Sequence, residues 1–411
     1  MGYELDAAAQ GRLDGYFSAI GIVLKNKTRR TSFAMYAMGL LGSAERKSAE
    51  PIAALAAADP VTCEATHHRL LRFLRDSPWS DRDVRLVAAR HALEAMTQEE
   101  PIRTWIIDDT GFLKQGTHSV GVHRQYTGSA GKITNCQVAV SLSVATRSAH
   151  MPIDFALYLP EKWTKDAARR LECKIPENVV FETKHELALD MIIGAVDDGV
   201  PGDIVLADSG YGDSHKFREA LRELGLDYAL GIHAPTKMWR LDGLERCRGE
   251  PVSAQALANG LSPKAFRRVT WRDGTARGPR GKLWSRFAFC RVKVAHDDGT
   301  DRATREPLWL MVEWPEGEKA PTKFALTTLR RTMSKKQLVR LLKERYRTEL
   351  VYEEMKGDLG LDHFEGRSFP AWHHHVSVAL CCYAFVIAER MRHFSPAAGR
   401  RSRDRSNAIA A

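Results

Sequence analysis

A run of four apolar residues, Ile204–Ala207, constrains the fold of this chain more than any other feature. A strand without a polar position is typical of a sheet that is buried on both faces, with helices on either side. The run ends at Asp208, in a loop that contains glycines. Helical patterns at 187–195 and 214–224 flank it, and a further strand is predicted at 228–232. The sequence therefore predicts an α/β fold.

A second set of strands is predicted upstream. Residues 104–107 form a short β-prone run that ends at Asp108 and Asp109. Between 136 and 144, apolar residues alternate with small or polar ones, which predicts a strand with one buried face. A third strand is predicted at 153–159. The sheet is therefore expected to begin near residue 104, where helical periodicity stops.

Positive charge is concentrated in one segment of the chain. The 411 residues carry a formal net charge of +10, and residues 264–293 hold ten basic residues and one acid. A basic segment of this density favours a polyanionic partner, above all nucleic acid. The alternative is a solvated loop that keeps the protein soluble. The hydrophobic share of 44% and the charged share of 27% are those of a folded chain, and the length predicts two or three domains.

The first hundred residues are predicted to be helical, because alanine and leucine dominate them. In the segment 68–75, apolar and basic residues alternate by helical turns, which gives one apolar and one positively charged face. Pro78 ends this helix, because proline restricts the residue before it. Two interpretations are open: a plain helical bundle, or a bundle whose basic face contacts DNA.

Regular periodicity is lost from about residue 235 to 321, where short strand-like runs accompany the basic segment. We interpret this region as a β-rich insertion. Helix resumes at Ser334, which forms a capping-box pattern with Gln337. It continues, with a break, to about residue 360, and a last helix is predicted at 371–392, followed by a basic tail.

Several function classes are not favoured. No basic stretch leads into an apolar segment at the N-terminus, so no signal peptide is predicted. The apolar stretch 376–388 is shorter than the ~20 residues that span a bilayer and is predicted to be a core helix. Seven scattered cysteines, an odd number without paired spacing, fit a reducing cytoplasm. No structural zinc site is predicted, and no Ser/His or Cys/His nucleophile pairing stands out along the sequence.

Three acidic residues form a possible metal site. Asp109 and Asp208 each follow a predicted strand, and the carboxyl ends of neighbouring strands converge in α/β folds. Glu349 is the third, on a predicted helix where Arg345, Tyr352, Glu353 and Lys356 share its face. Taken singly, an aspartate of this kind is more often a turn former or a helix cap. The helix could equally be a surface helix with local ion pairs, since spacing alone does not separate the two.

Four blocks of sequence and one spacing carry a resemblance. Arg345 is followed after three residues by Glu349, and Glu349 after six by Lys356, while Leu342 departs from the tyrosine that the pattern has in front. The chain thereby resembles bacterial insertion-sequence transposases of the DDE type, whose signature is Tyr-x2-Arg-x3-Glu-x6-Lys. The blocks resemble the subgroup numbered seven hundred and one; they lie at 106–111, 125–132, 206–212 and 360–366.

The resemblance implies a ribonuclease-H-like core with a β-rich insertion and an N-terminal helical domain. The domains expected are a helical DNA-binding and dimerisation domain, the first part of the core, the basic insertion, the second part of the core and a flexible tail, at 1–100, 101–234, 235–322, 323–394 and 395–411. The resemblance maps the catalytic metal ligands to Asp109, Asp208 and Glu349, with Asp108 as a rival for the first position. Carboxylates of this kind suit Mg²⁺, and two ions are expected, with Mn²⁺ as a substitute.

The implied function is cut-and-paste transposition: binding of terminal inverted repeats, metal-dependent cleavage through hairpin ends, and strand transfer. The alternatives are a non-catalytic DNA-binding descendant of a transposase and a ribonuclease-H-like junction nuclease. The partners expected are double-stranded DNA, at the transposon ends and the target, and a second copy of the chain in a homodimer. The expected location is the bacterial cytoplasm, with the nucleoid when DNA is bound.

Ten side chains are expected to contact DNA. Those near the catalytic glutamate are implied by the signature, and those in the insertion come from the basic segment. An insertion tryptophan could stack on a flipped base, or else pack in the core of the β segments. The ten are Arg345, Tyr352, Lys356, Arg267, Arg268, Trp271, Arg280, Lys282, Trp284 and Arg286.

Overall fold

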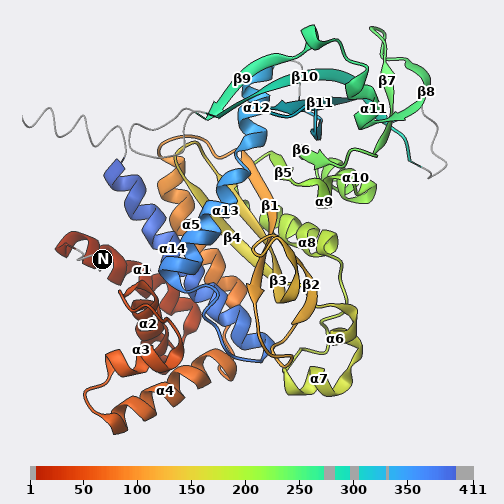
Figure 1. Ribbon diagram of the computed structural model, residues 1–411. Coiled ribbons are helices and arrows are strands. Elements are labelled where there is room, and N and C mark those ends of the chain that lie inside the picture. Colours follow the sequence, from red (N-terminus) through yellow and green to blue (C-terminus); the bar gives the residue numbers. More distant parts are fainter. Residues whose placement is uncertain (1–5, 273–282, 297–304, 330–332, 395–411) are drawn as a thin grey trace, which may run out of the picture. The chain divides into compact units, whose positions relative to one another are not determined.

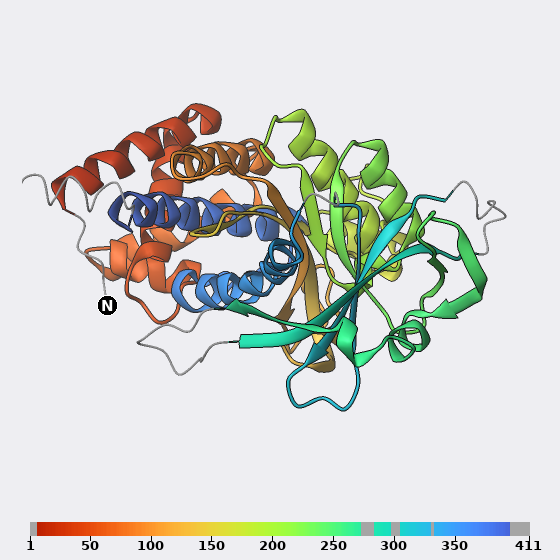
Figure 2. The same cartoon turned by 90° about the horizontal axis from the view of Figure 1, so that it is seen from above.

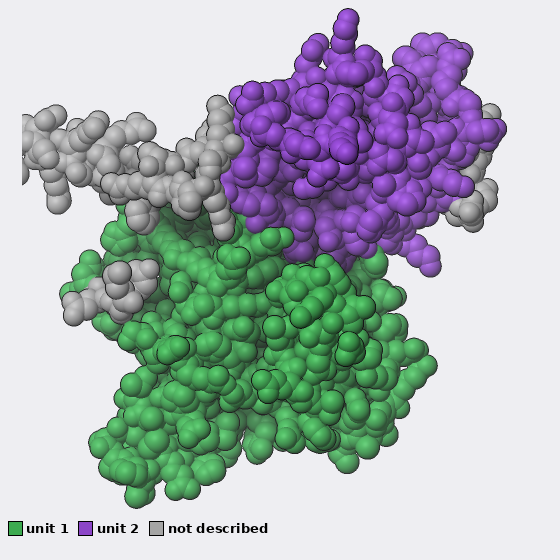
Figure 3. Space-filling view, in the orientation of Figure 1, with its two compact units in different colours: residues 1–103, 109–201, 347–411 green, residues 104–108, 202–346 purple. Residues whose placement is uncertain are grey.

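The computed structural model describes residues 6–272, 283–296, 305–329 and 333–394. The chain divides into two compact units (Figure 3). Unit 1 consists of residues 1–103, 109–201 and 347–411, and unit 2 of residues 104–108 and 202–346. Strand β1 (Thr104–Leu113) contributes its first five residues to unit 2 and the others to unit 1. Arg280, Lys282 and the tail from residue 395 lie outside the described residues.

The N-terminal part of unit 1 is helical, as predicted. Its helices are α1 (Ala7–Leu24), α2 (Lys27–Leu41), α3 (Ala49–Ala56), α4 (Pro60–Arg75) and α5 (Asp81–Thr97). Side-chain oxygens cap several of them: Asp6, Asn26, Asp59 and Ser80 each accept a bond from a backbone N–H in the first turn. These caps satisfy N–H groups that have no partner inside their own helix.

Helix α14 (Phe369–Phe394) is the core helix of unit 1. It lies along α5 and also packs against α2, α4 and strand β4 (His150–Leu157) (Figures 1 and 2). The segment Phe369–His393 is long and apolar enough to cross a membrane by length and composition alone, and 89% of its apolar window is buried inside the protein. Packing among helices therefore accounts for its composition, which agrees with the predicted core helix.

The sheet of unit 1 contains β2 (His123–Thr127), β3 (Lys132–Ala145) and β4, and β3 is antiparallel to β2 and to β4. The second part of β1 lies on the other side of β3 from β2 in the strand order. Residues 136–145 of β3 are buried at every position, whereas the alternation predicts one buried face. Ser141 shows the reason: its hydroxyl lies 2.6 Å from the hydroxyl of Tyr352, on helix α13 (Tyr346–Leu359). Helices therefore cover the face of β3 that carries small polar residues as well as its apolar face.

Three further helices complete unit 1. Short helices α6 (Glu161–Lys165) and α7 (Ala167–Glu172) precede α8 (Lys184–Asp197), which packs on β3 and β4. The capping box of Thr183 and Glu186 opens α8, with the Thr183 N–H donating to Glu186 at 2.7 Å.

Unit 2 is built on a mixed sheet whose parallel part contains the buried run. β1 pairs in parallel with β5 (Ile204–Ala207), which pairs in parallel with β6 (Asp227–Ile232). Helices α9 (Ser209–Gly212) and α10 (His215–Glu223) connect β5 to β6. The four residues of β5 are buried, which confirms the predicted α/β class around this strand.

The segment 235–321 is rich in strands. Beyond β6 the sheet continues through antiparallel strands in the order β12, β11, β10, β7 and β8, and β9 also pairs with β10. They span Lys323–Thr327 (β12), Leu308–Pro315 (β11), Leu283–Val294 (β10), Lys237–Leu241 (β7), Cys247–Ser253 (β8) and Arg267–Arg272 (β9). Helix α11 (Ala254–Asn259) and the 3₁₀ turn Pro263–Ala265 follow β8.

Helix α12 (Lys335–Lys343) packs on one face of this antiparallel sheet. Its Val339 joins a buried cluster with Phe287 and Met311, and Leu342 packs against that cluster. At its end, Lys343 Nζ lies 2.7 and 2.8 Å from the carboxylate oxygens of Glu313, which is 3% exposed. The capping box predicted at Ser334 is present, and the predicted break falls between α12 and α13.

Candidate active site

Asp208 caps the first turn of α9 immediately after the buried strand. Its Oδ1 accepts a bond from the Gly210 N–H at 2.9 Å, and the side chain is half-buried. The turn lies so close to β6 that a Cβ at Gly212 would come within 1.9 Å of the Gly231 carbonyl oxygen. This close approach explains a glycine at position 212 and fixes the backbone that carries Asp208.

His233 lies beside this turn, although no spacing in the sequence predicts it there. Ser209 Oγ is 3.2 Å from His233 Nε2, and His233 Nδ1 is paired with Asp213. Asp213 also accepts bonds from the His233 N–H at 3.1 Å and from the Thr236 hydroxyl at 2.8 Å. The sequence-based statement that no Ser/His pairing stands out therefore misses a real contact. Ser209 and His233 are 24 residues apart, so only the pairing of β5 with β6 brings them together.

The two adjacent aspartates of β1 have different partners. Asp109 Oδ2 forms an ion pair with Nζ of Lys184, the first residue of α8, within unit 1. Asp108 is 8% exposed and accepts a bond from Arg345 Nη1 at 2.8 Å, within unit 2. Successive residues of a strand point to opposite faces of the sheet, so the two aspartates have different surroundings. Asp109 is the more accessible of the two.

Glu349 is exposed on α13. The helix buries its other side, formed by Thr348, Val351, Tyr352, Met355 and Leu359. Arg345 precedes α13 and belongs to unit 2, so the prediction that it shares one helical face with Glu349 is wrong. Tyr352 is 6% exposed and bonded to Ser141, which gives it a packing role and leaves little of it for contact with DNA.

Lys356 ties α13 to the strand that carries Asp109. Its Nζ donates to the Gly111 carbonyl oxygen at 2.7 Å and lies 3.3 Å from Ser129 Oγ. Burial lowers the pKa of this lysine below its usual range. A Cβ at Gly111 would come within 1.8 Å of Thr127 Oγ1, so the hairpin of β2 and β3 lies directly on this point of β1. The block 125–132 thus supports the Asp109 strand.

The three predicted ligands fall in both units. Asp109 and Glu349 belong to unit 1, and Asp208 belongs to unit 2. Within either unit, the described residues include no group of three His, Cys, Asp or Glu side chains that could hold a metal ion. The donor chemistry nevertheless fits a hard cation, because all three are carboxylates.

The insertion side chains divide between two faces of the antiparallel sheet. On one face the Arg268 guanidinium lies 3.9 Å over the ring of Trp284, and that of Arg286 lies 3.9 Å over Trp314. Arg268 and Arg286 are cross-strand partners on this face, whereas the exposed Arg267 pairs with Phe287 and lies on the other face. On the other face Trp271 packs against the cluster beneath α12 and lies under Lys343 Nζ at 4.8 Å. The two predicted tryptophans therefore have different surroundings.

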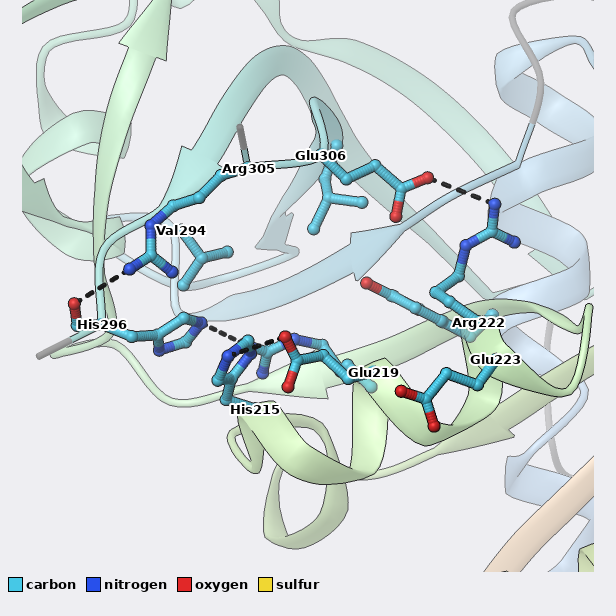
Figure 4. Close-up of a pocket in the computed structure, with 11 residues that line it drawn as sticks. His215, Glu219, Arg222, Glu223, Val294, His296, Arg305 and Glu306 are labelled. Carbon is cyan, nitrogen blue, oxygen red and sulfur yellow. Dashed lines mark hydrogen bonds and ion pairs between the residues drawn. The ribbon is translucent and has the colours of Figure 1, made fainter. Parts of the chain in front are cut away.

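A separate cavity of about 300 Å³ lies in unit 2 between α10 and the sheet (Figure 4). Glu219 pairs with His215 at 3.0 Å, and Glu306 pairs with Arg222 at 3.3 Å. Its lining holds as many glutamates as arginines, so it has no net formal charge apart from the histidines. It contains none of the predicted site residues.

Two protein families match the chain. Residues 21–278 match the family described as DDE superfamily endonuclease, and residues 176–385 match the family described as Transposase DDE domain. Each match spans more than half of the chain.

One curated relative is similar to part of the chain. Over 204 residues the sequence is 30% identical to the protein described as "Probable transposase for insertion sequence element IS701" from Microchaete diplosiphon. The aligned part covers 49% of each protein, so the chain spans about half the length of the curated relative it matches.

Proposed function

Because the chain belongs to the DDE superfamily of endonucleases and transposases, we propose that it is a DNA transposase of an insertion sequence. It binds the terminal inverted repeats, cleaves the strands through hairpin ends and joins them to a target by a cut-and-paste route. The observation that carries the proposal is the parallel pairing of β1 with β5, with Ile106 opposite Leu206. Asp108 and Asp109 lie inside β1, just past the part of it that pairs with β5, and Asp208 directly follows β5. The carboxyl ends of parallel strands are where α/β folds bind ligands.

Membership of this family implies dependence on a divalent metal. We propose Mg²⁺, with Mn²⁺ as a substitute and two ions per site, held by Asp109, Asp208 and Glu349. Hard carboxylate oxygens support this choice. When bound, such ions activate the attacking oxygen and stabilise the leaving oxygen of an in-line displacement at phosphorus. Asp109 is favoured over Asp108 because the latter is buried against Arg345.

Family membership also implies DNA as the substrate. We propose that the exposed or half-exposed cations of the candidate active site and of the insertion contact the DNA. Lys356 would hold a phosphate near the bond that is cleaved. In the insertion, we propose that Trp284 is the ring that receives a flipped base, because Trp271 packs beneath α12. Arg268 and Arg286, on the same face as this ring, would hold the flanking phosphates, and Arg267 is proposed to contact DNA from the other face. A stacked base contributes about 1–3 kcal/mol.

We also propose the domain division predicted from the sequence, in which residues 1–100 form a DNA-binding and dimerisation domain. The protein is proposed to act on DNA as a homodimer. Ultracentrifugation of the protein with and without end DNA tests the assembly. A single protein copy per end pair would contradict it.

The central test is cleavage of candidate end sequences in the presence of Mg²⁺. Glu349→Gln removes one metal ligand at an exposed position and should reduce cleavage more than about 100-fold, since even changes behind a ligand cost about 10- to 100-fold. Glu353→Gln, also exposed on α13, is the matched control and should cleave as the wild type does. Cleavage that survives Glu349→Gln contradicts the glutamate assignment, and DNA binding without any cleavage by the wild type favours the non-catalytic alternative.

A further inference from the structure

A groove of about 670 Å³ lies between α2 and α4 in unit 1, within the helical region 1–100 and apart from the residues proposed for cleavage. We name it the α2–α4 groove. Arginines and hydroxyl groups account for most of its polar lining: Thr28, Arg29, Ser32, Thr62, Arg69 and Arg72. The groove runs from the start of α2 to the side of α4.

The α2–α4 groove is positively charged. Its lining includes three arginines, and no acidic residue among the described ones lines it. The acids at the two ends of α4 have partners of their own. Asp59 accepts bonds from Thr62 as the cap of the helix, and Asp76 is paired with Arg75 and Lys174. The arginine charge is therefore not cancelled inside the groove.

Two buried polar atoms point to a ligand. Ser32 is 1% exposed, and its hydroxyl oxygen has no hydrogen-bond partner among the described residues. Arg69 Nε is also buried without a partner in the described part of the chain, and its Nη2 contacts the Met35 sulfur at 3.2 Å. A buried donor left without a partner destabilises a protein, so such atoms are rare unless something outside the chain satisfies them. An anionic oxygen would accept bonds from both groups.

The start of α2 adds to this field. Asn26 Oδ1 accepts the N–H groups of Thr28 and Arg29, which fixes the first turn beside the groove. The amino-terminal end of a helix carries a partial positive charge that favours anions. Arg69 and Arg72 lie three residues apart on α4, about 4.5 Å along the axis, which is comparable to the ~3.4 Å axial rise between phosphates of one strand.

We propose that the α2–α4 groove binds the phosphate backbone of duplex DNA, without reading bases. The inference deepens the proposed function and rests on it, because it assigns a grip on DNA that is separate from the cleavage site. The ligand class follows from three arginines, a helix start and unpartnered donors in one open groove. Contacts with phosphates position a protein on DNA and carry no sequence information directly.

The test measures binding to a fluorescent mixed-sequence duplex over a range of salt concentrations. Arg72→Glu changes an exposed side chain and should weaken binding uniformly across duplex sequences. The slope of log affinity against log salt should fall by about 0.9 for each phosphate that the variant no longer neutralises. Arg75→Glu is the matched control: it is exposed one turn further along the same helix but paired with Asp76, and it should leave the slope nearly unchanged.

Thr28→Asp distinguishes disruption of the groove from disruption of the fold. A negative charge in the first turn of α2 favours the helix, so the melting temperature should hold or rise while DNA affinity falls. Unchanged slopes in both Arg72→Glu and Thr28→Asp overturn the groove, as does a wild type with no salt-dependent duplex binding. Cleavage of end DNA that is abolished by Glu349→Gln beside unchanged slopes would leave the proposed function standing and reject the groove alone.

Discussion

Arg345 Nη1 lies 2.8 Å from Oδ2 of Asp108, and both residues belong to unit 2. The Asp108 side chain is 11% exposed and that of Arg345 30% exposed, so the pair is largely shielded from water. The ion pair joins the first half of β1 to the residue that precedes α13. It therefore gives Arg345 a structural role in addition to the DNA contact implied by the signature.

A double-mutant cycle with Arg345→Ala and Asp108→Asn should give a coupling energy of about 1–3 kcal/mol in urea unfolding, because the two charges are close and partly desolvated. The exposed pair Arg46 and Glu365 is the control. Its coupling should stay below about 1 kcal/mol, as for other surface pairs. Equal coupling in the two cycles would show that burial does not strengthen the Asp108 pair.

Lys184 is expected to compete with the proposed metal ions for Asp109, with which it forms an ion pair. Lys184→Ala removes an ammonium group in direct contact with that carboxylate, and Mn²⁺ should then bind about tenfold more tightly, because the repulsion between the two cations disappears. Lys184→Arg keeps the charge and should bind Mn²⁺ as the wild type does. Electron paramagnetic resonance of free Mn²⁺ measures both. Weaker binding in Lys184→Ala would mean that the lysine supports the site instead.

The two insertion tryptophans should differ in what they stabilise. Trp271→Ala removes a ring that packs on the cluster beneath α12 and should lower the free energy of unfolding by about 2–4 kcal/mol. Trp284→Ala removes mainly the interaction with the Arg268 guanidinium, which is expected to cost about 1 kcal/mol. Urea unfolding followed by circular dichroism compares them. A larger effect of Trp284→Ala would reverse the assignment of the two faces.

Acid should destabilise the protein through His375. Burial lowers the pKa of this side chain to about 4, and its Nε2 lies 3.1 Å from the Gly360 carbonyl while Nδ1 lies 2.9 Å from the Tyr36 hydroxyl. The unfolded state then binds more protons than the folded state between pH 4 and the ordinary value of 6.5. Stability falls as the pH falls through this window, by up to about 3 kcal/mol.

His375→Gln removes the titration at this site and should flatten the dependence of unfolding free energy on pH between 6.5 and 4. The exposed residue His118 offers the control, since His118→Gln should leave the wild-type slope intact. The readout is the urea midpoint at each pH. Identical slopes for His375→Gln and the wild type would show that another buried histidine, such as His150, dominates.

Local patterns predict much of this fold. The apolar run at β5 and the capping box at Ser334 depend on neighbours within a few residues, and both are present in the structure. The aspartate directly after β5 is predictable for the same reason. The prediction that the first strand stops before Asp108 is wrong, because β1 continues through both aspartates to Leu113. The full burial of β3 is not, because its serines are covered by elements that lie far away in the sequence.

The partners of the site residues depend on tertiary structure. Lys184 is 75 residues from Asp109, and Arg345 is 237 residues from Asp108. Any lysine or arginine in such a basic chain could have filled these positions, so composition offers no way to choose among them. His233 shows the same limit, since its contact with Ser209 exists only once β5 and β6 have paired.

The burial of α14 has a consequence for synthesis on the ribosome. Helices α2, α4 and α5 leave the exit tunnel long before residues 369–394, against which they pack. Their apolar faces stay uncovered during most of translation, when a nascent chain is open to aggregation and to chaperones. A premature stop codon ahead of residue 369 would therefore leave the first helices without their central partner, and we expect such a truncated product to be degraded.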